Sequence, residues 1–306
     1  MAVPRPAPAR RVFRPERRVP WGTWILAVVF LLAAVGATGA ILLVVQPARV
    51  ADLGRSESQQ LGLARTGAAT VQQSLNALWA DLGPGGPFAL TADKVSADLA
   101  LAQTTEKQAS DALAYDEVAK ADLVEADAIP FQLHPPLFTK SDRPAVLHLE
   151  TGLQAASRLA HAATLELELA QTVAADQGTL DGQLTPALNA HAWTEAARAA
   201  STAQGQLKAE QLGAANPDAL LDPLWGKWIE ARLAYAQTAQ SYALNAASGQ
   251  ASTAQQLLQT LSTQSAAIQA TGTAARRGAA SWAAQTIQPL LDTVSREVGA
   301  ASLSAG

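Results

Sequence analysis

Residues 61–82, LGLARTGAATVQQSLNALWADL, place apolar side chains at alternating steps of three and four: Leu61, Ala64, Ala68, Val71, Leu75, Leu78 and Leu82. This spacing matches the helical period of 3.6 residues, so the side chains form one stripe along a helix. The run ends at 83–87, Gly-Pro-Gly-Gly-Pro, which is a helix stop and a turn. The stretch therefore predicts a long helix that buries one face.

The same spacing recurs in five further segments, at 91–124, 145–177, 185–213, 216–246 and 252–298. Gly178 and Gly182 predict a break before the fourth helix, which Thr185-Pro186 opens, and Pro289 predicts a kink or division of the last helix. Short connections favour antiparallel neighbours. The predicted fold is all-α, a bundle of about six long antiparallel helices, with an α-solenoid as the open alternative.

The composition agrees with a helical fold. The chain of 306 residues contains 69 alanines, and only 5% of its residues are aromatic. Small side chains on the facing stripes let helices approach closely, so packing depends on many small contacts. The chain has no cysteine, which excludes a disulfide scaffold, a thiolate metal site and a cysteine nucleophile. High alanine usage and a preference for arginine over lysine suit a GC-rich bacterium.

The N-terminus combines a basic tail with an uncharged apolar stretch. Residues 1–21 hold five prolines and six arginines, which predicts a disordered tail, and residues 19–48 have no charged side chain. Trp24–Val45 is apolar apart from Thr38 and glycines, and 22 helical residues span about 33 Å. Residues 22–46 are therefore predicted to be a transmembrane helix that serves as a signal anchor.

Basic residues beside the apolar stretch predict its orientation. Residues on the cytoplasmic side of a membrane helix are enriched in arginine and lysine. The predicted membrane-orienting residues are Arg10, Arg11, Arg14, Arg17 and Arg18. The chain is thus expected to cross the plasma membrane once, with its C-terminal mass extracytoplasmic. The alternative is a cleaved export signal, because Arg10-Arg11 resembles a twin-arginine pattern and 35–37 resembles a weak cleavage site.

The extracytoplasmic part divides at a proline-rich segment. Residues 47–128 are predicted to form a first helical hairpin, 129–144 a non-helical loop with four prolines, and 145–306 the remaining helices of the bundle. Phe131 and Phe138 lie in this loop as candidate contacts for a ligand or partner, with a lid over a helix end as the alternative.

Aromatic residues on the fifth helix are the other candidate contacts. Trp225, Trp228, Tyr235 and Tyr242 share one helical face. Such a stripe fills a core or lines a groove.

The sequence offers little that points to catalysis. No nucleotide-binding, zinc-binding or hydrolase motif is present. The acidic residues between 111 and 127 are predicted to form a solvated helix face, and the histidines to be surface or boundary residues. We therefore expect no enzyme, no cofactor and no metal.

The expected function is that of a non-catalytic binding or scaffolding module of the cell envelope. Its expected partners are the lipid bilayer and either a protein or a second copy bound through the bundle, and the acidic outer part speaks against nucleic acid. The alternative is a small-molecule-binding domain. The topology resembles, at fold level only, helical sensor bundles outside bacterial membranes, but the short tail holds no output module, so a signal would pass through a membrane partner.

Overall fold

The computed structural model describes residues 21–129 and 138–303, with the side chains of 21–23, 42–43 and 138–141 outside that description. The five predicted membrane-orienting arginines, Phe131 and the Phe138 side chain therefore lie outside the described part. Within it the chain forms helices joined by turns, without a strand, which confirms the all-α prediction. Two compact units are present: residues 1–52 with 129–135, and a helical unit of residues 53–128 with 136–306.

The first unit contains α1 (Trp21–Ala40), the π-helical turn η1 (Ile41–Val45) and the start of α2. The large apolar side chains of α1 are exposed on every side, from Val28 at 50% to Phe30 at 70%. Among the described residues, however, none of the helices is both long enough and apolar enough to cross a membrane. The membrane-spanning helix at 22–46 stays a prediction.

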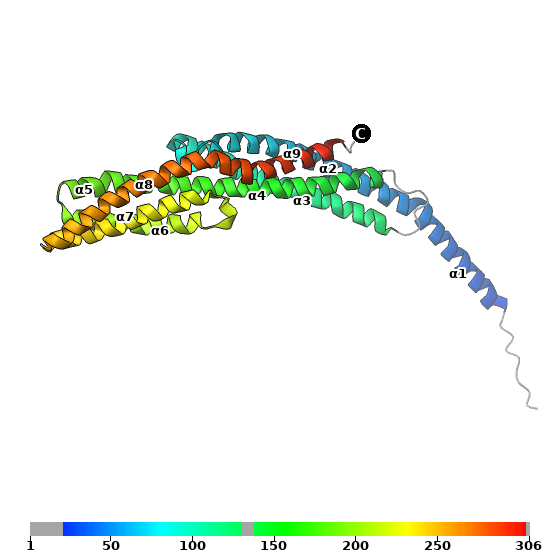
Figure 1. Cartoon of the computed structure of the whole chain (residues 1–306). Helices are drawn as coiled ribbons and strands as arrows, with labels where there is room; N and C mark the ends of the chain where they lie inside the picture. Colours follow the sequence, from blue (N-terminus) through cyan, green and yellow to red (C-terminus); the bar gives the residue numbers. More distant parts are fainter. Residues whose placement is uncertain (1–20, 130–137, 304–306) are drawn as a thin grey trace, which may run out of the picture. The chain divides into compact units, whose positions relative to one another are not determined.

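The helical unit is built from long helices, labelled in Figure 1: α2 (Gln46–Leu82), α3 (Ala92–Ala128), α4 (Phe138–Thr179), α6 (Trp193–Ala214), α7 (Pro223–Ala247), α8 (Ala251–Thr286) and α9 (Gln288–Leu303). The short elements are η2 (Pro87–Ala89), η3 (Leu180–Leu184), α5 (Thr185–Asn189) and η4 (Pro217–Ala219). Among the described residues, α8 and α9 divide at Ile287, so the predicted division near Pro289 is confirmed.

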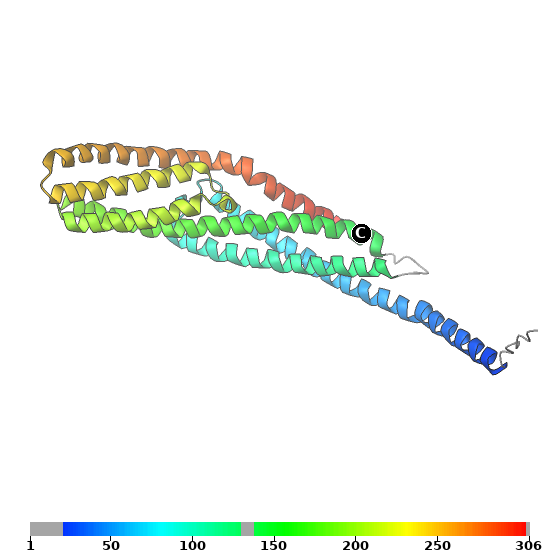
Figure 2. The same ribbon diagram turned by 90° about the horizontal axis from the view of Figure 1, so that it is seen from below.

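Two hydrophobic cores share helix α4. The first core joins α2, α3, α9 and α4 residues between Ala145 and Ala170. The second joins α6, α7 and α8 with Leu169, Val173 and the turn η3 that follows α4. Figures 1 and 2 show α3 and α9 beside one part of α4 and α6 beside the other, with α7 between α6 and α8. Helix α4 therefore contributes to both cores, and Phe88 of η2 and helix α8 also contact both.

The stripe predicted in residues 61–82 faces the first core. Each of its seven apolar residues is at most 2% exposed, so the predicted buried face of this helix is confirmed. The packing is close because the contacting residues are small. A Cβ atom placed on Gly67 of α2 would lie 2.9 Å from the Cβ of Ala112 on α3. At this point the two helices approach as closely as a glycine permits.

The predicted non-helical loop at 129–144 is wrong in its second half. Helix α4 begins at Phe138 and includes Pro144. A proline inside a helix removes one backbone hydrogen bond. Burial of Ala145, Val146 and Leu149 directly after it holds this turn against the first core and offsets that loss.

The predicted break at Gly178 and Gly182 is also wrong. The chain stays helical from α4 through η3 into α5, and the break falls instead at 190–192, where His191 has a φ of 56°. Gly178 lies in α4 and Gly182 in the π-helical turn, whose first and last residues, Leu180 and Leu184, are buried in the second core and hold the chain helical there.

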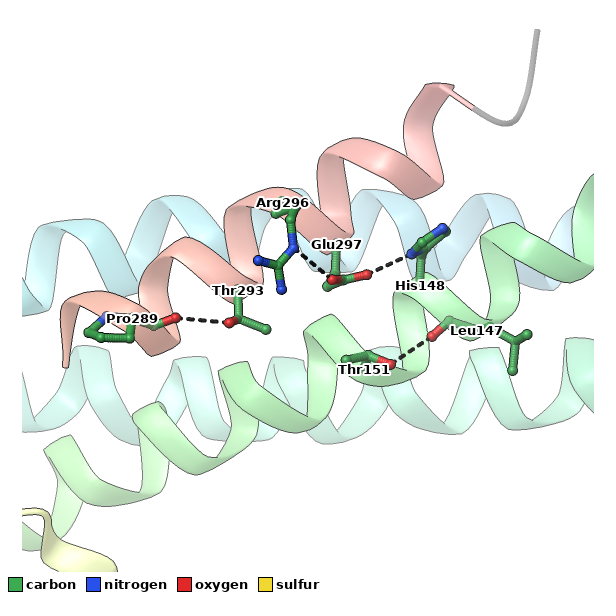
Figure 3. A network of polar contacts seen from close by, with 7 residues as sticks. All are labelled: Leu147, His148, Thr151, Pro289, Thr293, Arg296 and Glu297. Atoms are coloured by element: carbon green, nitrogen blue, oxygen red, sulfur yellow. Dashed lines mark hydrogen bonds and ion pairs between the residues drawn. The ribbon is translucent and has the colours of Figure 1, made fainter. Parts of the chain in front are cut away.

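Helix α9 is fastened to α4 by a polar network (Figure 3). His148 Nδ1 lies 2.6 Å from Glu297 Oε2, and Arg296 Nε donates to Glu297 Oε1 at 2.9 Å. The hydrogen bond from His148, followed by that from Arg296, lowers the pKa of Glu297. A Cβ atom on Gly152 would lie 3.1 Å from the Glu297 Cβ, so this glycine permits the close approach of α9.

Candidate functional site

The strongest candidate for a site is a groove of about 610 Å³ in the second half of the helical unit. It is lined by the end of α4, η3, α5, α7 and α8. The lining residues are Gln177, Leu180, Asp181, Thr185, Trp228, Arg232, Tyr235, Ser265, Ile268, Gln269, Gly272, Thr273 and Arg276. Its volume is within the usual range for small-molecule sites.

The π-helical turn η3 shapes one wall of the groove. Leu180 and Leu184 belong to the second core, and Leu180, Asp181 and Thr185 line the groove. The Leu180 carbonyl accepts from the Thr185 backbone N–H and, at 3.0 Å, from the Thr185 hydroxyl. π-Helical turns are frequent at functional sites.

A buried ion-pair cluster lies beside the groove. Arg232 Nη2 donates to Asp176 Oδ2 at 2.6 Å, and its Nη1 lies 3.6 Å from Glu210 Oε2. The side chains are 3% exposed for Arg232 and 0% for each acid. The guanidinium also lies 4.5 Å from the centre of the Trp228 ring, which attracts a cation through its negative face. The cluster connects α4, α6 and α7.

Burial changes the acid–base properties of this cluster. Loss of water raises the pKa of Asp176 to about 6 and that of Glu210 to about 7, although the nearby Arg232 charge opposes both shifts. Near neutral pH the Arg232 charge is therefore paired mainly with Asp176, and Glu210 is partly protonated.

The groove itself offers binding groups of both signs. Arg276 supplies a cation and Asp181 an anion. Burial raises the pKa of the Tyr235 phenol, and the nearby Asp181 charge raises it further. Hydroxyl and amide groups complete the lining. No histidine or cysteine is among the described lining residues, so their hydroxyl groups have no adjacent imidazole base. The arrangement is suited to binding a polar molecule.

The first core also contains buried acids. Glu57 on α2 and Asp116 on α3 are each 1% exposed. Desolvation is the largest cause that raises both pKa values, to about 7. Because Asp116 belongs to the acidic run at 111–127, the prediction of a solvated face is wrong at this residue.

The aromatic stripe of α7 is divided between core and groove. Trp225 is 1% exposed and packs edge-on against Phe88, with ring centres 4.7 Å apart. Trp228 and Tyr235 line the groove, whereas Tyr242 contacts the Trp193 ring at 5.6 Å. The structure thus places all four on one face, but only two of them at the candidate site.

Two predicted surface histidines take part in contacts between helices. His148 pairs with Glu297, as described above, and His161 Nδ1 lies 2.9 Å from Glu106 Oε1 on α3. Among the described residues there is no group of three or more side chains that could hold a metal ion.

Arg232 was missed in the sequence analysis, although its position in the sequence indicates a buried ion pair. Arg232 lies seven residues after Trp225, so it occupies the same face of the helix. A charged residue on an otherwise apolar face indicates a buried ion pair. Its partners could not be named in advance, because Asp176 and Glu210 come from other helices.

No protein-family model matches the chain, and comparisons with curated proteins and with solved structures gave no match.

The buried acids predict a stability that falls as pH rises. Glu57, Asp116 and Glu210 bind a proton more tightly in the folded chain than in the unfolded chain, where pKa values are about 4. The contribution of these protons to folding is therefore complete below about pH 4, falls as pH rises from about 4 to about 7, and is lost above that. We expect the chain in mild detergent to unfold at lower urea concentration at pH 8 than at pH 5.5.

Replacing the buried acids by uncharged amides tests whether they cause the pH dependence of stability. The double variant Glu57→Gln with Asp116→Asn should flatten the pH dependence, whereas Glu230→Gln, at an exposed position, should leave it unchanged. Equal stability of the wild type at the two pH values would contradict the prediction.

Proposed function

We propose that the chain is a membrane-anchored helical module that binds or scaffolds other molecules at the cell envelope without catalysis. The observation that supports a membrane anchor is the apolar surface of α1. The side chains of residues 24–26 and 28–32 are apolar or aliphatic and exposed. Successive helical residues differ by 100° in direction, so these residues cover the whole circumference of the helix.

Such a surface is unfavourable in water and favourable in lipid. A helix that is apolar on all sides is typical of a buried or membrane-embedded segment. The helix α1 ends at Ala40, but the uncharged stretch continues through η1 into the first residues of α2. Including η1 brings the apolar stretch to Val45, a length that fits the hydrocarbon layer.

The proposed topology places the N-terminus and the helical unit on opposite sides of the membrane. The five arginines at 10, 11, 14, 17 and 18 favour a cytoplasmic N-terminus. The helical unit is then extracytoplasmic, where it meets a protein partner or a second copy. Its helices bury one face each and leave polar faces outward, as expected for a unit surrounded by water.

Single cysteines test this topology directly, because the natural chain has none. With Ser248→Cys, in the exposed turn between α7 and α8, we expect labelling by a membrane-impermeant maleimide in intact bacterial cells. With Ala2→Cys we expect labelling only after permeabilisation. The chain should also stay in the membrane pellet at alkaline pH.

The matched control places charges in the anchor. Leu31→Arg with Leu32→Arg should release the chain from the pellet, since each charge at the centre of a bilayer costs about 3 kcal/mol. Wild-type chain in the soluble fraction, or Ser248→Cys protected in intact cells, would refute the anchored topology.

A second candidate function is the binding of a small molecule in the groove on α7, which its volume and mixed-charge lining favour. A screen of amino acids, organic acids and sugars against the full chain in detergent should find a compound that raises the Tm. The Arg276→Gln variant should lose this response, and Arg277→Gln, next to it on α8 and outside the groove, should keep it. No response of the wild type to any compound would count against this function.

A further inference from the structure

A small cavity, lined mostly by apolar surface, lies where the two cores meet. Its volume is about 10 Å³, and residues from α2, the 83–87 turn, α4, α7 and α8 line it. Four of the lining residues have a buried polar atom: Trp79 and Trp225 an indole N–H, and Glu166 and Asp222 a carboxyl oxygen. None of these four atoms has a hydrogen-bond partner within the described chain. All four side chains belong to residues that are more than nine-tenths buried.

The remaining contacts of these residues fix them in place. Asp222 Oδ1 already accepts from the Leu224 N–H at 2.9 Å as the N-cap of α7, which leaves Oδ2 for the cavity. Gly86 has a φ of 72°, and a Cβ atom there would lie 2.7 Å from Trp225 Nε1. A side chain at this glycine would collide with the indole, so the wall of the cavity depends on glycine.

The donors and acceptors match one particular ligand. Two N–H donors and two oxygen acceptors are what a water molecule needs to use both its lone pairs and both its hydrogens. A volume of about 10 Å³ is the least that holds one water, and buried waters usually make two to four hydrogen bonds. No positive charge is present among the described lining residues.

We propose that one water molecule binds in this cavity, where it accepts from the two indole N–H groups and donates to the two carboxyl groups. The water joins α2, α4 and α7 at the point where α4 passes from the first core to the second. Burial and the nearby Asp222 charge keep the pKa of Glu166 well above its usual range. In its neutral form Glu166 still accepts a hydrogen bond through its carbonyl oxygen.

Nuclear magnetic resonance of the full chain in detergent, with ¹⁵N-labelled tryptophan, tests the proposal without any variant. Cross-relaxation between water and the indole protons of Trp79 and Trp225 should be present. Laboratory-frame and rotating-frame signals of opposite sign identify a bound water rather than proton exchange. Trp79→Phe and Trp225→Phe assign the two indole resonances. Absence of the water signal at both indoles in the wild type would overturn the proposal.

A matched pair of variants on α8 tests whether a larger side chain displaces the proposed water. Ala279 lines the cavity, so Ala279→Val should fill it, abolish the water signal and leave the polar atoms unpaired. The unfolding equilibrium constant should then rise about tenfold or more. Ala280→Val, at an exposed position of the same helix, should keep the water signal. An unchanged water signal in Ala279→Val would also contradict the proposal.

Discussion

Helix α4 contributes buried side chains to both hydrophobic cores, and the arrangement of the other helices depends on this shared helix. Its first part packs with α2, α3 and α9, and its end packs with α6, α7 and α8. The change of partners occurs at Leu167–Val173, where Leu167 belongs to the first core and Leu169 to the second. Phe88 of η2, which packs against both cores, adds a second link between them. Continuation of the helix through η3 extends the shared element into the wall of the groove.

Buried polar groups give these alanine-rich helices a defined register. Alanine stripes offer the same small side chain at each step, so shifting one helix along another costs little packing. An ion pair such as Arg232 with Asp176 forms in one register only, and a shift would leave a charge buried without a partner. The water that we propose between Glu166 and Asp222 imposes the same kind of restriction at the junction of the cores. Burying these acids costs free energy of folding, but it also selects one register of the helices.

Local features of the sequence were sufficient for most of the fold. The stripe from Leu61 to Leu82 predicted the buried face of α2, and the segment predicted at 91–124 corresponds to α3. The errors arose where tertiary burial outweighs local preference. Buried leucines carry the helix through Gly182, and burial after Pro144 extends α4 toward its N-terminus. The groove and the ion-pair cluster were not predictable, because their residues come from helices whose mutual register the sequence leaves open.

Hydrogen–deuterium exchange across the helical unit tests most directly whether α4 joins the two cores. Leu75, on α2, is fully buried in the first core, and Leu75→Ala should destabilise that core by about 2–5 kcal/mol. If α4 couples the cores, the slowest-exchanging amides of α6 and α7 will lose protection together with those of α2 and α3. Faster exchange confined to α2, α3, α9 and the first part of α4 would contradict this account, because the two cores would then unfold independently.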